Sequence, residues 1–230
     1  MTTLVSLRTR LRSLLDETTA LFWTDAQLTE WLNDGCSDLA RRAEIIETIN
    51  STIAALVNTS TYALPANCLR VTSIEYLNAG ITYPITPTTR SNVNRMFGGG
   101  MSASIPLYFI VFGLMGSATI PAQFTVYPPP SLAGTFNIYY YASPTPMVAD
   151  SDIAQIPNGW EELPVVYAQF KAMQKNQDPT WQAIAQLYES KVHELISVTR
   201  DLTDRQIKSL QGQPAQQDVG RLAAGQQPPG

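Results

Sequence analysis

The first fifth of the chain has apolar residues at helical spacing. Between residues 4 and 15 the leucines recur every three or four positions, and arginines fill the positions between them: Leu4, Leu7, Leu11, Leu14 and Leu15. This period predicts an amphipathic helix that buries one leucine face.

A second helix is predicted from a capping signal. Thr24 is followed three residues later by Gln27, the spacing of a capping box, in which each side chain satisfies a free backbone amide of the other residue. An apolar stripe of period 3.6 then continues through Leu28, Trp31, Leu32, Cys36, Leu39 and Ala43. We therefore expect a helix from Asp25 to about Ile46.

Two more helices are predicted near the other end. The first has Pro164 in its first turn, where proline is tolerated, and a stripe of Leu163, Val166, Tyr167, Phe170 and Met173. The second begins with Asp178 as N-cap and Pro179 in the first helical position. Its apolar residues are Trp181, Ile184, Tyr188, Val192, Leu195 and Leu202.

The middle of the chain has no helical period. Prolines and the run of glycines at 98–100 exclude long helices there. Four segments rich in β-branched and aromatic residues, bounded by Gly or Pro, are expected to be strands: 70–77, 107–112, 123–127 and 135–141. Their short connections favour an antiparallel sandwich or a small barrel.

The last residues lack any apolar period. Residues 212–230 are mostly Gly, Pro and Gln, and such a segment buries too little apolar surface to offset its ordering entropy without a partner. The sequence thus predicts an α+β fold. The N-terminal helices (1–58) and C-terminal helices (151–211) form a four-helix bundle, with an inserted antiparallel β domain (59–150) and an extended C-terminal tail (212–230).

Charge is unevenly distributed along this pattern. The chain has a formal net charge of -4, and 15% of its residues are charged, against about 25% in a typical soluble chain. Between Tyr76 and Ala149 the only charged residues are Arg90 and Arg95. Because interface cores are depleted in charge and enriched in aromatics, we expect the β region to be covered by other subunits, in a closed ring.

Composition excludes several kinds of site. His193 is the only histidine and Cys36 and Cys68 are the only cysteines, so no metal, cofactor or histidine-based catalytic site is expected, and both cysteines should be buried apolar residues. The acidic balance disfavours a general nucleic-acid binder. No apolar run is long enough to cross a bilayer, so a membrane partner is not expected.

An acidic pair and a run of tyrosines are candidates for catalysis or ligand binding, but both fit structural roles better. Glu161 and Glu162 form one of several acidic pairs, and acids at helix starts ordinarily stabilise the helix rather than act as a glycosidase pair. The run from Tyr139 to Tyr141 suits sugar or base stacking, but aromatic residues are also ordinary in strands.

Collinear segments resemble a known family. They are FWTD at 22–25 with Leu28 and WLN at 31–33, YALP at 62–65 with CLRV at 68–71, VYPPP at 126–130, IYYYA at 138–142, Ile156-Pro157, and the last two helices with Asp178. Together they cover residues 4–205 and resemble the head-to-tail adaptors, also called connector or tail tubular proteins, of tailed bacteriophages, particularly short-tailed ones.

The resemblance implies a non-enzymatic virion protein at the head–tail junction, assembled in the host cytoplasm. It implies a dodecameric ring that joins the portal to the tail nozzle or tail tube and continues the channel through which double-stranded DNA passes. It also implies portal contact by the tail, for which we expect Gln213, Pro214, Val219, Arg221 and Leu222 to be the contacting residues. A loop with Arg90, Asn92, Asn94 and Arg95 is a candidate to face the channel or the nozzle; a solubilising loop is the alternative.

Three other readings stay open. A tail component could bind host surface glycans through Tyr139 to Tyr141 and the loop at Gly98. A tail-associated cell-wall hydrolase would use Glu161 or Glu162. A globular protein of the host is the least specific reading.

Overall fold

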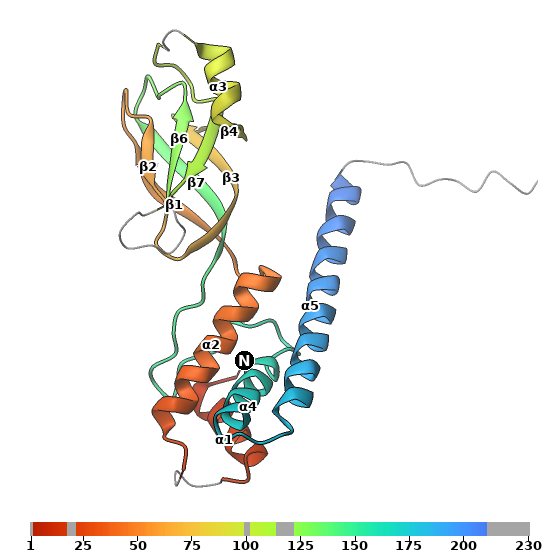
Figure 1. Cartoon of the computed structure of the whole chain (residues 1–230). Helices are drawn as coiled ribbons and strands as arrows, with labels where there is room; N and C mark the ends of the chain where they lie inside the picture. The colour runs from red at the N-terminus through yellow and green to blue at the C-terminus, as the bar shows by residue number, and fades with distance from the viewer. Residues whose placement is uncertain (1, 18–21, 99–101, 114–121, 211–230) are drawn as a thin grey trace, which may run out of the picture.

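The computed structural model describes residues 2–17, 22–98, 102–113 and 122–210, with the side chains of 200–210 excepted. The molecule is elongated (Figure 1). One end is a helical body made of α1 (Leu4–Leu14), α2 (Asp25–Ala43), α4 (Leu163–Lys175) and α5 (Trp181–Leu210). The other end is a β domain that α2 leads into.

The helical predictions agree closely with these elements. Thr24 and Gln27 form the expected capping box, and α2 starts at Asp25. The helix ends at Ala43 rather than Ile46, because Glu44 adopts a left-handed conformation and the chain becomes extended. Asp178 accepts the Thr180 amide, and α5 begins at Trp181, two residues later than expected.

Two apolar cores hold the helical body together. One joins α1, the start of α2 and α4, and the other joins the end of α2, α4 and the first half of α5. Gly35 lets α2 approach α4 closely, since a Cβ there would lie 3.0 Å from the Pro164 Cα. Both cysteines are buried and free, as expected.

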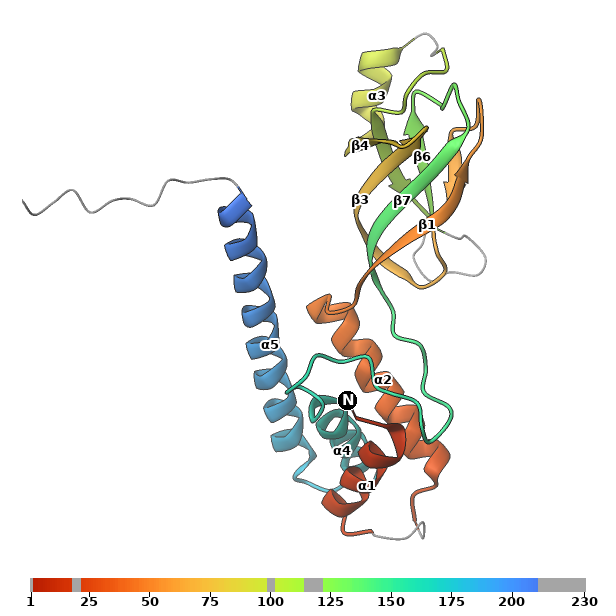
Figure 2. The same cartoon turned by 180° about the vertical axis from the view of Figure 1, so that it is seen from behind.

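The helices differ from the expected four-helix bundle. The α5 helix has 30 residues against 11 in α1. Leu195 and Ile196 still pack in the core of the body, and the C-terminal end of α5 extends beyond the other helices on the side of the β domain (Figures 1 and 2). The α+β class is confirmed, whereas a regular bundle of four matched helices is not what the structure shows.

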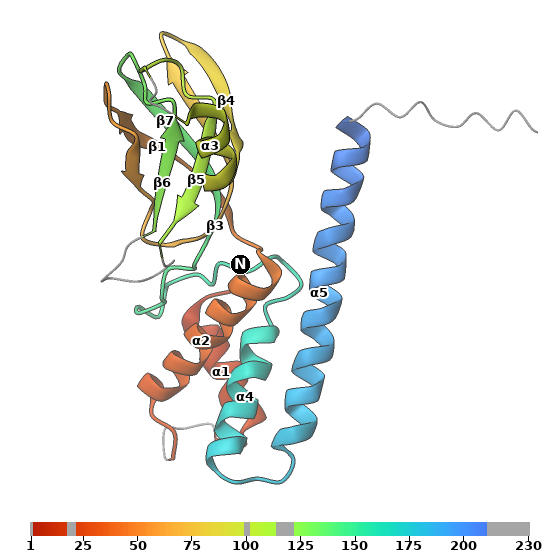
Figure 3. The same ribbon diagram turned by 45° about the horizontal axis from the view of Figure 1, so that its top comes forward.

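The β domain is one seven-stranded sheet that curls into a nearly closed barrel (Figure 3). In spatial order its strands are β1 (Glu47–Ala55), β7 (Gly134–Ala142), β3 (Cys68–Asn78), β4 (Ile81–Pro87), β5 (Tyr108–Phe112), β6 (Gln123–Tyr127) and β2 (Thr61–Ala63). The two outer strands, β1 and β2, are consecutive in sequence. Side chains from all seven strands fill one core, with Phe124 and Phe136 fully buried at its centre.

One strand pair departs from the expected antiparallel arrangement. The pairing of β4 with β5 is parallel, whereas the other pairs are antiparallel. A parallel pair needs a crossover of about a dozen residues or more. The segment between Pro87 and Tyr108 supplies it and contains the short helix α3 (Arg90–Phe97).

Three strands were not predicted from the sequence. β4 lies in the middle region, β2 has only three residues, and β1 was placed with the N-terminal helices in residues 1–58. β1 lacks the alternating apolar pattern of a strand because it has polar residues on both faces. Asn50 and Thr52 lie at a bulge, where the Asn50 side chain accepts the Thr52 amide. β1 belongs to the sheet because it pairs along its length with β7.

Two chain segments connect the helical body to the β domain, and both are tied down. Asn33 on α2 donates to the Met147 carbonyl and accepts the Met147 amide, each at 2.9 Å. Met147 itself is buried. On the other segment, Glu44 pairs with Arg70 of β3, whose guanidinium lies over the Tyr141 ring. These contacts fix the direction in which the β domain leaves the helices.

Candidate assembly surfaces

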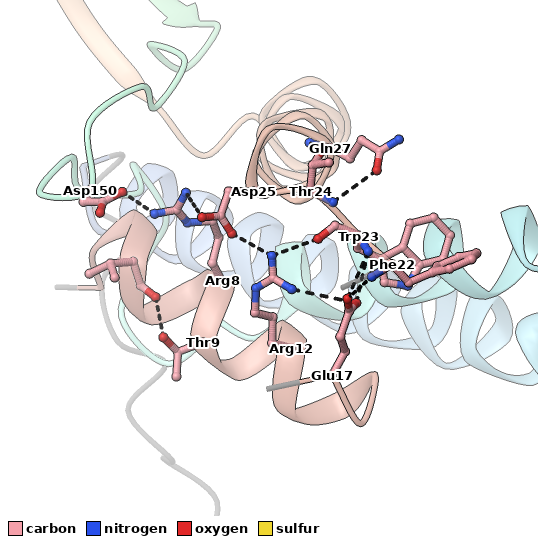
Figure 4. Close-up of polar contacts among 11 residues, drawn as sticks. Arg8, Thr9, Arg12, Glu17, Phe22, Trp23, Thr24, Asp25, Gln27 and Asp150 are labelled. Atoms are coloured by element: carbon pink, nitrogen blue, oxygen red, sulfur yellow. Dashed lines mark hydrogen bonds and ion pairs between the residues drawn. The ribbon is translucent and has the colours of Figure 1, made fainter. Parts of the chain in front are cut away.

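A polar network orders the connection between α1 and α2 (Figure 4). Arg12, which is 8% exposed, donates to the Trp23 carbonyl at 2.9 Å and to Asp25 at 2.7 Å. Glu17 accepts the amides of Phe22 and Trp23. The hydrogen bond from Arg12 lowers the pKa of Asp25, helped by the charges of Arg8 and Arg12 and opposed by partial burial.

The same network positions the side chain of Phe22, which is exposed to solvent. Phe22 is 66% exposed and packs edge-on against the buried Trp23, with ring centroids 4.5 Å apart. Lys175 of α4 lies over the rings of Trp23 and Trp31. The backbone amides of Phe22 and Trp23 both donate to Glu17, which leaves the ring little backbone freedom. The start of α2, which follows these residues, lies at the end of the helical body opposite the β domain (Figure 1).

A second network joins α2 to α5. Tyr188 is buried and donates its hydroxyl to Asp38 at 2.8 Å, and Arg42 pairs with both Asp38 and Glu189. Burial alone would raise the pKa of Asp38, but the hydrogen bonds from Tyr188 and Arg41 and the charge of Arg42 together lower it. Burial and the bond to the Asp38 carboxylate raise the pKa of Tyr188. This network anchors the half of α5 that does not project.

The β domain exposes many apolar side chains and few charged ones. Nine large apolar residues of this domain are more than a third exposed: Ile49, Leu56, Val57, Ile81, Met96, Ile105, Leu107, Phe112 and Leu132. The sequence predicted a charge-poor surface but did not identify these residues. A detectable signal was aliphatic residues beside turn residues, as at Val57-Asn58 and Gly80-Ile81.

Arg90, Asn92, Asn94 and Arg95 lie on a helix, which corrects the expected loop. Thr89 caps α3 by accepting the Asn92 amide, and the helix forms because Val93 and Phe97, four residues apart, pack inward. The four predicted side chains are all exposed. They are thus brought together on one short helix, with their side chains exposed.

The tyrosine run divides between the two faces of the sheet. Tyr140 is buried and donates its hydroxyl to Asn67, so it belongs to the core. Tyr139 and Tyr141 are on the other face and only partly exposed, Tyr139 donating to Glu75. A stacking platform of three tyrosines is therefore absent, since the middle ring points inward.

The candidate hydrolytic glutamates are engaged in local contacts. Glu161 accepts the Gly159 amide at 2.7 Å, and such backbone hydrogen bonds lower its pKa, the opposite of what a general acid requires. Glu162 pairs with Lys191. His193 is exposed on α5. The described part of the chain holds no group of three or more His, Cys, Asp or Glu side chains placed to bind a metal ion.

Other predicted residues lie outside this description. Gln213, Pro214, Val219, Arg221 and Leu222 follow the last described residue, Leu210. Among the described helices none is both long and apolar enough to cross a bilayer.

The comparisons with known proteins decide the family. The model of the SU10 adaptor protein family matches residues 2–215, which is nearly the whole chain and includes both the helical body and the β domain. The chain belongs to the SU10 adaptor protein family. The predicted membership of the phage head-to-tail adaptors is therefore confirmed, and the protein is a structural adaptor of a phage particle.

Other comparisons add less. A solved structure described as the neck of an empty GTA particle, computed with C6 symmetry, contains a chain that shares 16% identity with the adaptor. The alignment covers 72% of the adaptor and 74% of that chain, with a TM-score of 0.27. No curated protein matches the adaptor.

Proposed function

We propose that the adaptor assembles as a closed ring, a dodecamer, between the portal and the tail nozzle or tail tube, and that the ring continues the channel for double-stranded DNA. The observation that carries the ring is the β-domain surface, which has exposed aliphatic side chains and almost no charge. Such a surface is typical of interface cores, and a head-to-tail contact repeated by rotation leaves no surface uncovered only when the ring closes.

Two further parts of the proposal concern neighbouring components. Residues after Leu210 contact the portal, with Arg221 and Leu222 as the main anchors among Gln213, Pro214 and Val219. A segment rich in Gly, Pro and Gln that orders on its partner gives a wrapping contact with low affinity per unit area. The ring forms in the host cytoplasm and then becomes part of the virion neck.

Low charge suits passage of DNA. Each lysine or arginine that engages a phosphate adds salt-dependent affinity, so a channel that must release DNA works better with few such contacts. Arg90 and Arg95 on α3 are the only charged residues between Tyr76 and Ala149. We propose that they face the channel or the nozzle, with Asn92 and Asn94 beside them.

Electron microscopy of the purified adaptor, alone and mixed with portal rings from the same virus, tests the function. We expect closed rings, or rings that form on the portal. An adaptor lacking residues 212–230 should assemble poorly onto the portal, while a full-length chain carrying Val5→Asp on the exposed side of α1 serves as control. An adaptor that stays monomeric and does not bind portal rings contradicts the proposal.

A further inference from the structure

The exposed side of α3 is positively charged, which distinguishes it from the apolar surface of the β domain. Arg90 and Arg95 lie on this helix with both side chains exposed. Neither forms an ion pair with another described side chain. Because they are the only charged residues between Tyr76 and Ala149, that region has no carboxylate to neutralise them.

The positive charge of α3 also contrasts with the chain as a whole. Residues 47–142, which form the β domain, contain three arginines and two glutamates, a formal net charge of +1, whereas the whole chain has -4. The third arginine, Arg70, pairs with Glu44 at the end of α2 and lies over the Tyr141 ring. α3 lies at the end of the β domain farther from the helical body (Figure 1). The arginines that lack an ion pair are therefore at that far end.

The other exposed polar side chains of α3 are uncharged hydrogen-bonding groups. Ser91, Asn92 and Asn94 are exposed beside the arginines, and the helix has no carboxylate. Met96 is its one large apolar side chain that is exposed. Phosphate oxygens accept hydrogen bonds from arginine, serine and asparagine side chains. This set of groups fits a phosphate backbone, which is negatively charged and offers acceptors in a row.

Packing keeps the polar side of α3 in solvent. The Thr89 side chain caps the start of the helix, and Val93 is buried. The Phe97 ring packs edge-on against Tyr108 of β5, with ring centroids 6.2 Å apart. Because the apolar side of the helix is fixed to the barrel, the arginines are presented from an ordered element, which lowers the entropy lost on binding.

The spacing of the two arginines suits two separate phosphates. They are five residues apart, which is a rise of about 7.5 Å at 1.5 Å per residue. Successive phosphates of one DNA strand are about 3.4 Å apart along the duplex axis. Arg90 and Arg95 are therefore far enough apart to engage different phosphates of the same duplex.

We propose that the exposed side of α3 contacts the phosphate backbone of double-stranded DNA through Arg90 and Arg95. The inference rests on the proposed function, under which DNA passes through the ring, and it selects the channel rather than the nozzle as the side these residues face. Two cations per subunit make each contact weak, and the ring repeats it around the duplex. DNA is thus held loosely and is released at little cost.

Binding of the purified full-length adaptor to double-stranded DNA of mixed sequence, at several salt concentrations, tests the inference. Each phosphate that a cation neutralises contributes about 0.9 to the slope of log affinity against log salt, so Arg90→Gln/Arg95→Gln should reduce the slope by at least about 1.8. Between about 50 and 200 mM salt the wild-type affinity should therefore fall about tenfold more than that of the variant.

Two variants serve as controls. Arg10→Gln removes an exposed arginine of α1 and should bind DNA like the wild type. Arg90→Lys/Arg95→Lys keeps both charges and should keep the slope, because lysine binds phosphate as a point charge. Unchanged melting curves show that the variants are folded. The inference fails if the glutamine variant of α3 keeps the wild-type slope, or if either control loses as much slope as that variant.

Photo-crosslinking in DNA-filled particles distinguishes DNA from a protein partner. Asn94, which is exposed on α3, is replaced by p-benzoylphenylalanine in the full-length adaptor, and particles with the wild-type chain are irradiated in parallel. We expect a crosslink from position 94 to DNA. Crosslinks from position 94 only to the nozzle, to another adaptor copy or to a different protein, or no crosslink, overturn the inference.

These results separate the inference from the proposed function. If the adaptor forms closed rings whose DNA binding does not depend on Arg90 and Arg95, the ring stands and the inference fails. If the adaptor forms no ring but binds DNA through both arginines, the ring fails and the phosphate contact stands.

Discussion

Of the contacts that hold α5, the hydrogen bond between Tyr188 and Asp38 can be tested by a single conservative substitution. The substitution Tyr188→Phe removes one hydroxyl from a buried ring and leaves its packing against Tyr167 and Phe170 intact. Asp38 keeps its ion pairs with Arg41 and Arg42. The change therefore isolates a single bond to a partly buried carboxylate.

The expected cost follows from the kind of bond. Hydrogen bonds to charged groups contribute about 1.5–3 kcal/mol, and the two remaining arginines keep the loss near the lower end, about 1–2 kcal/mol. For a chain of this size each kcal/mol lowers the melting temperature by about 2–4 °C. We therefore expect Tyr188→Phe to melt about 2–8 °C below the wild type at pH 7.

The loss should also depend on pH. Because the folded state lowers the pKa of Asp38 from its ordinary value of 3.8, its contribution is present above that value and is lost as pH falls through the folded pKa. The wild type and Tyr188→Phe should thus converge in stability at pH values below about 3.8. Above the ordinary tyrosine pKa the wild type should lose more stability than Tyr188→Phe, since folding raises the pKa of Tyr188 and the variant lacks that group.

Urea denaturation of the two proteins at several pH values measures this difference. Tyr167→Phe is the matched control, because Tyr167 lies in the same core and its hydroxyl has no hydrogen bond among the described residues. The control should change stability by less than about 0.5 kcal/mol. Equal stability of Tyr188→Phe and the wild type at pH 7, or a difference that persists unchanged in acid, refutes the role given to this bond.

Three further predictions concern the connection between the two parts of the molecule and the core. Gly134→Ala should destabilise the β domain by about 1–3 kcal/mol in urea melts, because the new Cβ would lie 2.4 Å from the Leu77 carbonyl; a neutral result contradicts this. Asn33→Ala should cost about 2–4 kcal/mol by leaving both backbone groups of buried Met147 unpaired, and amide exchange near 147 should accelerate. Burial raises the pKa of the Cys36 thiol to about 12, so a disulfide reagent at pH 8 should modify it only after denaturation; rapid modification of the native protein opposes this.

Helices were predictable from sequence because their signals are local. The capping box at Thr24 and Gln27 fixes the start of α2, and the leucine period fixes α1. β1 was missed because it carries polar residues on both faces around Asn50, and its pairing with β7 joins residues that are far apart in sequence.

For the surface, too, local features were predictable from the sequence and long-range ones were not. The lack of charge between Tyr76 and Ala149 is written in the sequence and predicted an assembly surface. The clustering of Leu56, Ile81 and Leu132 at one end of the barrel could not be predicted from the sequence, because these residues belong to three different connections that only the barrel brings together. Likewise the parallel pairing of β4 with β5 depends on a crossover whose helix begins with the polar residues of α3.

Cryo-electron microscopy of the neck of the assembled particle is the most direct test of the account. The account predicts a closed ring of this chain between portal and tail, with the charge-poor β domains against protein neighbours. A neck in which the β domains stand free in solvent, or in which the chain forms no ring, contradicts it.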